Sequence, residues 1–307
     1  MAVTVIKDIA VDEKDREILF KLFRDHEDVL GSSRIAMLAL QAFINSIQAL
    51  RCDAADADLR DLFTELCEAI RHTEPRIVPL IHLIKPFETE MQSQYSDDLE
   101  KTKNEAIRIL TAKLDLLKSK VGKIIEHGVG LIKDGDTIIV HTASSDVTKM
   151  LAMAREVFQK NFKVIILKQD FVKTKLLIKT LSRAEVELLV VPEYSLSHYI
   201  EQANKMFIGA MSVTHDAKVV TAIGTSNIVS LCHLNKIPVY LFATSLKFSH
   251  HPSSHQKIHT KMVAKSQDDV NYTLTTHSHD IVDLKLIDYL ITEEGKVGKR
   301  GMAKYVE

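Results

Sequence analysis

Residues 207–248 read FIGAMSVTHDAKVVTAIGTSNIVSLCHLNKIPVYLFATSLKF. This stretch predicts a strand, a glycine-containing loop, a short strand, a Gly-Thr turn, a helix and a further strand. Alternating strands and helices are typical of a parallel sheet whose ligands bind beyond the carboxyl ends of its strands. We therefore expect a ligand-sized crevice at that end of the sheet.

The same alternation extends over the whole second half of the chain. Short, nearly continuous apolar runs alternate there with helical segments, as expected for strands that are covered on both faces. The predicted strands are TIIVHT (137–142), KVIILK (163–168), VELLVV (186–191), KMFIGA (205–210), VVTAI (219–223) and IPVYLFA (237–243). They predict a doubly wound, mainly parallel, Rossmann-like sheet.

The first half of the chain reads differently, because its apolar residues recur at helical spacing. We expect amphipathic helices over 12–30, 34–50 and 56–73, a short helix ending near Pro86, and a long helix over 96–132. A turn signal at 133–136 then introduces the strands. The predicted class is α/β, with a helical N-terminal domain over 1–128 and a Rossmann-like domain over 129–307.

Composition bounds the class of protein. The 307 residues carry a net charge of −1, whereas a strong nucleic-acid binder more often has a basic excess, so we expect no direct nucleic-acid contact. No apolar run reaches the roughly 18 residues of a membrane span. Three cysteines without metal-ligand spacing indicate reduced thiols and a cytoplasmic location. The dinucleotide fingerprint G-x-G-x-x-G does not follow the first strand, so dinucleotide binding lacks its usual signal. We expect neither a metal nor a cofactor.

Five motifs follow one another along the chain: IKDGDTIIVHTAS (132–144), FIGAMSV (207–213), VVTAIGTSNIV (219–229), IPVYLFATSLKF (237–248) and VDLKLIDYLITEEGKV (282–297). In this order they resemble the translation initiation factor 2B alpha/beta/delta family. That family also contains 5-methylthioribose-1-phosphate isomerase and ribose-1,5-bisphosphate isomerase. The resemblance implies the fold already predicted. Within the family, the chain is most similar in type to an alpha-like subunit.

The resemblance also places the acid/base groups of the isomerases. Their cysteine position is Thr142 here, and their aspartate position is Met211. An aldose–ketose shift needs groups that exchange protons near neutral pH, which a threonine hydroxyl does poorly and a thioether not at all. The Asn-Lys pair that precedes Ile-Gly-Thr in the family is Thr221-Ala222. We interpret these departures as loss of the isomerase reaction and expect no catalytic residue.

Ligand binding does not depend on those groups. Two turns, 141–145 and 224–226, lead into predicted helices whose first N–H groups would suit a phosphate. The alternative is that Ser145 and Ser226 are ordinary helix caps. The candidate ligand-binding residues are His141, Thr142, Ser144, Ser145, Gln169, Met211, Thr221, Gly224, Thr225, Ser226 and Arg34.

Two further patterns leave alternatives open. A rearranged acid/base set of His141 or Asp216 would keep the chain an isomerase of a phosphorylated ribose-type sugar. Histidines cluster at 250–259 and 277–279, where they would form either a metal site or a polar surface loop; we favour the loop.

The leading hypothesis is a non-catalytic regulatory or binding protein that senses a phosphorylated sugar or nucleotide in the crevice. The resemblance implies a homodimer or larger assembly, and it allows protein partners similar to initiation factors. A component of a nucleotide-exchange complex is a third possibility, which requires partner subunits.

Overall fold

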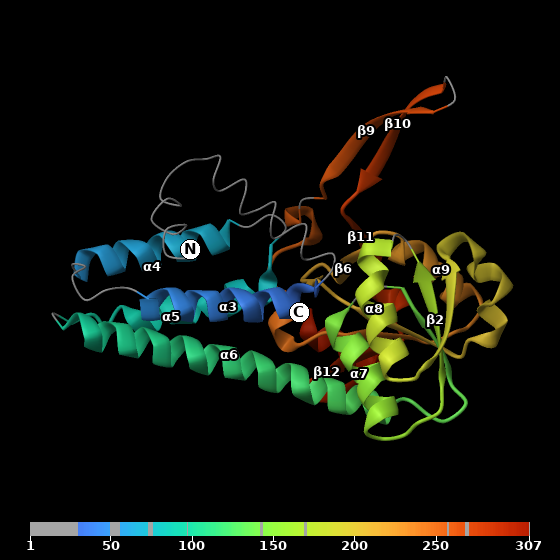
Figure 1. The fold of residues 1–307 in the computed structure, drawn as a ribbon, viewed down its shortest axis with the longest axis horizontal. Helices are drawn as coiled ribbons and strands as arrows, with labels where there is room; N and C mark the ends of the chain where they lie inside the picture. The colour runs from blue at the N-terminus through green and yellow to red at the C-terminus, as the bar shows by residue number, and fades with distance from the viewer. Residues whose placement is uncertain are drawn as a thin grey trace. The chain divides into compact units, whose positions relative to one another are not determined.

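The computed structural model divides into two compact units, Met1–Lys123 and Ile124–Glu307. Figure 1 colours the chain from blue at the N-terminus to red at the C-terminus. The residues that the structure describes are 30–49, 56–72, 76–96, 98–141, 144–168, 171–256, 258–267 and 270–306. The helix expected over 12–30 therefore lies almost entirely outside the described residues. No helix among the described residues is long and apolar enough to cross a membrane.

The first unit is helical. Its helices are α3 (Ser32–Ala49), α4 (Asp56–Arg71), α5 (Val78–Met91) and α6 (Leu99–Gly130), the last of which continues into the second unit. Phe43, Phe63 and Phe87 pack edge to face at its centre, with ring centroids 5.5–5.8 Å apart. The prediction that a helix ends near Pro86 is wrong, because α5 continues through it. The missing backbone hydrogen bond is outweighed by burial of Phe87 and Met91 beyond the proline.

The second unit is built on a seven-stranded sheet of order β13-β12-β7-β4-β1-β2-β3. All neighbouring strands are parallel except β12 and β13. The strands are β1 (Thr137–Val140), β2 (Lys163–Lys168), β3 (Glu187–Pro192), β4 (Lys205–Gly209), β7 (Val239–Phe242), β12 (Tyr289–Thr292) and β13 (Gly295–Gly298). The predicted mainly parallel α/β fold is confirmed.

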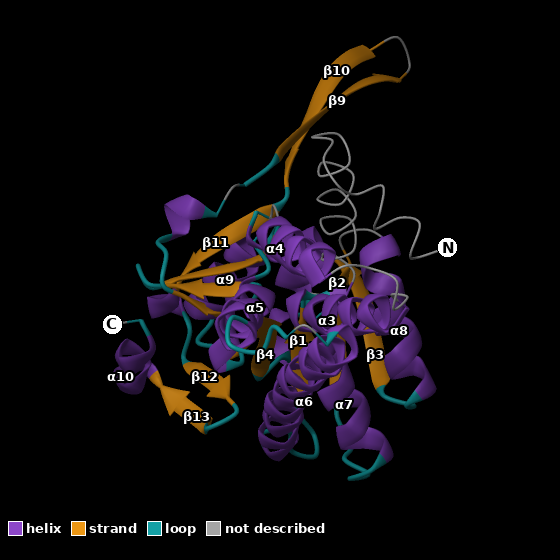
Figure 2. Cartoon of the chain, turned by 90° about the vertical axis from the view of Figure 1, so that its left-hand side faces the viewer, coloured by secondary structure: helices purple, strands orange, loops and turns teal. Residues whose placement is uncertain are grey.

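Successive side chains of a strand point to opposite sides of the sheet, so these apolar strands present two apolar faces. Helices cover both of them. On one face, Ile139 and Ile208 pack in a core with Ile228 and Cys232 of α9 (Thr225–Leu234). The other face forms a second core with α7 (Ser145–Glu156), α8 (Phe171–Arg183) and the end of α6. Figure 2 shows α7 and α8 on this second side of the sheet.

One predicted strand belongs elsewhere. The run expected at 219–223 forms β6 (Lys218–Ala222), which lies in a separate four-stranded sheet of order β11-β6-β5-β8. Its neighbours there are β11 (His279–Asp283), β5 (Ser212–Thr214) and β8 (Phe248–Ser249). The turn between β5 and β6 is tight, with Ala217 at φ +56°, so the strands pair as an antiparallel hairpin. A parallel return needs a crossover of about a dozen residues, which this segment lacks.

A two-stranded ribbon projects from the second unit in both views (Figures 1 and 2). It consists of β9 (Thr260–Gln267) and β10 (Val270–His277), paired antiparallel, and every side chain of β10 is exposed. At its base, Ser278 N–H donates to the carbonyl of His259 (2.9 Å), and His259 N–H donates to Ser278 Oγ (3.0 Å). The polar surface loop was expected at 250–259 and 277–279, on either side of the ribbon, and the two strands of the ribbon were not predicted.

The remaining elements are short. The segment between β3 and β4 consists of two 3-10 turns and contains no α-helix. These turns and the other short elements are η1 (Glu193–His198), η2 (Ile200–Gln202), η3 (Ser245–Lys247), η4 (Ser253–His255), η5 (Leu284–Leu286), α10 (Lys299–Met302) and η6 (Ala303–Tyr305).

Candidate functional site

The residues that follow β1, β4 and β7, together with the turn before α9, form what we call the crest. Parallel strands bring their carboxyl ends to one edge, and Gly209 of β4 pairs there with Phe242 of β7. Thr221 Oγ1 donates to the carbonyl of Gly209 (3.2 Å), so β6 also reaches this edge. The crest is where the sequence analysis expected a ligand.

The first crest turn leads from β1 into α7. Ser144 caps the helix, because its Oγ accepts the backbone N–H of Val147 (3.4 Å). A Cβ added at Gly209 would lie 2.5 Å from Ser144 Oγ, so glycine is required for this cap to lie against β4. Ser145 Oγ donates to Asp146 Oδ1 (3.1 Å), so Ser144, rather than Ser145, is the cap.

The second crest turn leads into α9 and has a different arrangement. Gly224 occupies the N-cap position at φ +87°, a conformation that favours glycine, and it has no side chain with which to cap the helix. Instead, Ser226 N–H donates to Asp280 Oδ2 of β11 (2.9 Å). A carboxylate of the chain itself thus occupies the position where a phosphate was expected.

His141 lies at the end of β1 with both ring nitrogens in hydrogen bonds, and it is only 2% exposed. Nδ1 lies 3.0 Å from Thr225 Oγ1, and Nε2 lies 2.6 Å from Glu193 Oε1. The Thr225 hydroxyl donates its one proton to the carbonyl of Ala222 (2.6 Å), so it accepts from Nδ1–H. The two contacts tie the end of β1 to the first turn of α9 and to η1, so His141 serves as a structural link.

A buried ion pair beneath the crest escaped the sequence analysis. Lys247 is 3% exposed, donates from Nζ to the carbonyl of Ala210 (2.8 Å), and lies 3.7 Å from Asp146 Oδ2. It therefore ties β4 to the start of α7. The Lys-Phe pair that ends the strand motif at 237–248 was the available signal, whereas nothing in the local sequence indicated Asp280 or Glu193.

The other predicted residues are scattered. Met211 is half-buried, and its N–H donates to the carbonyl of Val220 (2.9 Å). Arg34 is exposed on α3 of the first unit. Thr142 and Gln169 lie outside the described residues.

Asp216 is exposed on the turn between β5 and β6, where it accepts from Ser253 N–H (2.8 Å) and Oγ (2.6 Å). Burial opposes its ionisation, but the hydrogen bonds from Ser253 and Thr214 outweigh it and lower the pKa of Asp216 to about 2. It is therefore ionised at neutral pH, which is unfavourable for a general acid.

The histidine-rich segment and the two described cysteines, Cys67 and Cys232, show no metal site. The rings of His251 and His255 stack with centroids 5.3 Å apart. Within the described ranges, no group of three His, Cys, Asp or Glu side chains could hold a metal ion. Cys232 belongs to the core, where burial raises the pKa of its thiol to about 12.

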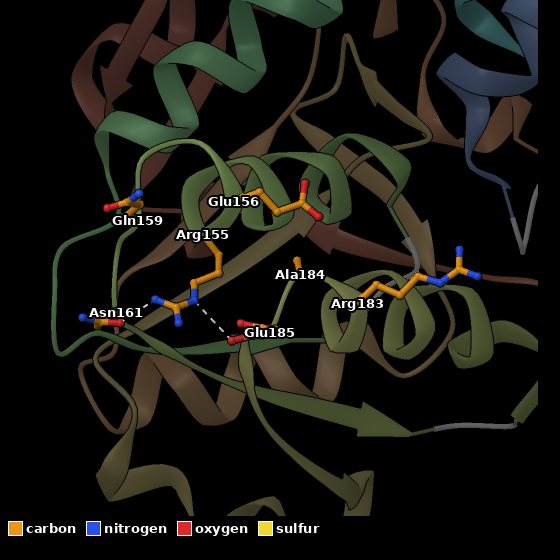
Figure 3. Close-up of a pocket in the computed structure, with 7 residues that line it drawn as sticks. All are labelled: Arg155, Glu156, Gln159, Asn161, Arg183, Ala184 and Glu185. Carbon is orange, nitrogen blue, oxygen red and sulfur yellow. Dashed lines mark hydrogen bonds between the residues drawn. The ribbon is translucent and has the colours of Figure 1, made fainter.

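Two adjoining cavities lie at the opposite edge of the sheet, near the amino ends of β1 and β2. Figure 3 shows one of about 570 Å³, lined by Arg155, Glu156, Gln159, Asn161, Arg183, Ala184 and Glu185. Its neighbour of about 500 Å³ shares Arg155, Asn161 and Glu185. Arg155 donates to Asn161 Oδ1 (2.6 Å) and to the carbonyl of Glu185 (3.2 Å), so it clamps two turns together. Its place in the last turn of α7 suits the helix dipole.

A helical unit followed by a unit with a mostly parallel sheet defines a Rossmann-like α/β protein. The chain belongs to the initiation factor 2 subunit family, whose sequence pattern it matches over residues 28–299.

Relatives in this family bear two kinds of name. The chain is 29% identical to a translation initiation factor eIF-2B subunit 2-like protein of Pyrococcus abyssi over 88% of this chain and 92% of that protein. It is 23% identical to ribose 1,5-bisphosphate isomerase of Haloferax volcanii over 89% of this chain and 85% of the relative. Membership in the family therefore does not separate a binding subunit from an isomerase.

Solved structures show the same fold. The eIF-2B crystal structure from Pyrococcus horikoshii has a TM-score of 0.73 at 24% identity, covering 94% of this chain and 98% of that chain. The 5-methylthioribose 1-phosphate isomerase of the same organism has a TM-score of 0.74 at 14% identity, with coverages of 94% and 87%.

Proposed function

We propose that this chain is a non-catalytic member of the family that binds a small phosphorylated ligand, a sugar phosphate or a nucleotide, at the crest. The observation that carries the proposal is Met211, which stands at the end of β4 where the isomerase pattern has an aspartate. A thioether cannot transfer a proton, so the expected acid/base step lacks one partner.

The state of the alternative acid/base groups supports this proposal. His141 uses both ring nitrogens to hold Thr225 and Glu193, which leaves neither nitrogen facing a substrate. Asp216 lies on a different turn and is held by Ser253. The α7 turn, with Ser144 and Ser145, is the place at the crest where we propose that the phosphate binds.

We further propose that the protein works in an assembly in the cytoplasm, as a homodimer or with chains similar to initiation factors. One structural neighbour is the tetrameric eIF2B-beta2-delta2 complex from C. thermophilum, with a TM-score of 0.65 at 18% identity over 95% of this chain and 93% of that one. Light scattering of the purified chain would test the homodimer, and a monomeric mass would argue against it.

The decisive test of the chemistry is turnover. The purified protein is incubated with ribose 1,5-bisphosphate and with 5-methylthioribose 1-phosphate, and ketose product is followed by ³¹P NMR beside an authentic isomerase. We expect no product from this chain, and stabilisation by at least one sugar phosphate or nucleotide in a thermal-shift series. Stabilisation by none of them would remove the ligand from the proposal.

A second candidate rests on the short 2.6 Å contact of His141 with Glu193, since a carboxylate that orients a histidine is a recurring acid/base arrangement. In that case the chain is an isomerase with a rearranged acid/base set. Measurable turnover that His141→Ala abolishes would establish this second function and refute the first.

A further inference from the structure

The two crest turns lie close enough to serve one ligand. His141, three residues before the α7 cap, contacts Thr225 in the first turn of α9 (3.0 Å). Gly209 lies against Ser144 on one side and accepts from Thr221 on the other. Two neighbouring helix N-termini suit a ligand with two phosphates, one for each turn.

Only one of the two turns is occupied by a carboxylate without a countercharge. Asp280 lies opposite Thr221 in the β6–β11 pairing, and this register brings its Oδ2 to 2.9 Å from Ser226 N. Within the described part of the chain, no Lys or Arg pairs with Asp280. At the α7 turn, by contrast, Asp146 has the buried Lys247 as its countercharge (3.7 Å).

A phosphate arriving at the α9 turn would therefore have to displace a carboxylate that already accepts the Ser226 N–H, and it would meet that negative charge at close range. At the α7 turn, the Asp146–Lys247 pair is neutral overall, and the cap Ser144 presents a hydroxyl. The two turns thus differ in charge although both begin a helix after a short loop.

We infer that Asp280 is a specificity-determining residue that limits the crest to ligands with a single phosphate. It supplies the helix cap that Gly224 lacks, and in doing so it closes the α9 turn to a second phosphate. The inference rests on the proposed function for the identity of the ligand class, and it separates singly phosphorylated sugars or nucleotides from bisphosphates.

The test compares ribose 5-phosphate with ribose 1,5-bisphosphate by titration calorimetry at fixed ionic strength. The wild-type chain should bind ribose 5-phosphate about tenfold or more tightly than the bisphosphate, because the second phosphate meets the Asp280 carboxylate. Asp280→Ala frees the Ser226 N–H and removes the charge, so it should shift the ratio toward the bisphosphate by tenfold or more. Asp280→Asn keeps an oxygen that can cap α9 and removes only the charge; it should shift the ratio in the same direction by less, and it serves if the alanine variant does not fold.

The matched control is Asp283→Asn, which removes the same charge from the same strand beside Lys218 and Lys285. It should leave the ratio unchanged. A wild-type chain that binds the bisphosphate as tightly as ribose 5-phosphate or more tightly, or Asp280 variants with the wild-type ratio, would overturn the inference.

Failure of the proposed function would look different. If the wild type binds neither sugar phosphate, inorganic phosphate becomes the probe. Binding of it by Asp280→Ala but not by wild type would uphold the role of Asp280, whereas no binding by either chain would overturn that role as well.

Discussion

Replacing Gly209 by alanine tests the geometry of the crest most directly. The new Cβ would lie 2.5 Å from Ser144 Oγ and 2.7 Å from Ser144 Cβ, distances that real atoms do not adopt. The α7 cap must therefore move, which costs about 1 kcal/mol for the lost cap and about 1–3 kcal/mol for overpacking. Alanine also lowers the conformational entropy of the unfolded chain relative to glycine, which offsets about 0.5 kcal/mol of this loss. We expect a net loss of about 2 kcal/mol in the free energy of unfolding.

The assay is unfolding in urea, monitored by circular dichroism. We expect the dependence of the unfolding free energy on urea concentration to be the same in both proteins. Gly130→Ala is the control, because nothing lies within 4 Å of a Cβ there and the same chemical change should cost nothing. Ser144→Gly combined with Gly209→Ala removes both clashing atoms and should recover most of the loss, since glycine is tolerated at an N-cap. A surface substitution typically changes the free energy of unfolding by up to about 0.5 kcal/mol. If Gly209→Ala changes it by no more than that, the proposed packing of Ser144 against β4 is refuted.

Two further predictions concern charges away from the crest. Burial opposes ionisation of Asp283, but hydrogen bonds from Lys285 and Lys218 outweigh this effect and lower the pKa of Asp283 to about 2. A lowered carboxyl pKa stabilises the fold above the unfolded value near pH 4, so wild type should exceed Asp283→Asn by about 1 kcal/mol at pH 7, after allowance for solvent screening. That advantage should vanish as the pH falls from 4 to 2, and one that grew in acid would contradict the assignment. Lys205→Met strands the buried carboxylate of Asp136 and should cost about 3 kcal/mol, whereas Lys163→Met breaks only an exposed pair with Glu187 and should cost less than about 0.5 kcal/mol. Equal losses in the two urea curves would argue against the difference in burial.

The order of strands and helices was readable from the sequence because β1, β2, β4 and β7 are nearly continuous apolar runs between helical segments. The partner of β6 was not readable, because a β-branched run does not say which strand it pairs with. Chain length held the missing information: too few residues separate β4 from β6 for a parallel crossover.

For the site, too, the local turns could be predicted from the sequence but their distant partners could not. Gly224, Ser144 and Ser226 mark the turns, since local chemistry decides caps and turns. The groups that complete those turns come from elsewhere: Glu193 lies 52 residues after His141, and Asp280 lies 54 residues after Ser226. Contacts at such separations depend on the folded topology, and a single sequence carries no local trace of them.

The projecting ribbon has a consequence for how this chain tolerates changes in length. Its two strands leave and re-enter the unit at His259 and Ser278, which hold each other through reciprocal hydrogen bonds. The rest of the chain therefore follows the same path whatever number of residues lies between those two positions. Closing a longer or shorter excursion changes the entropy only logarithmically. The segment is thus a natural insertion point, where residues can be gained or lost while the sheets remain intact.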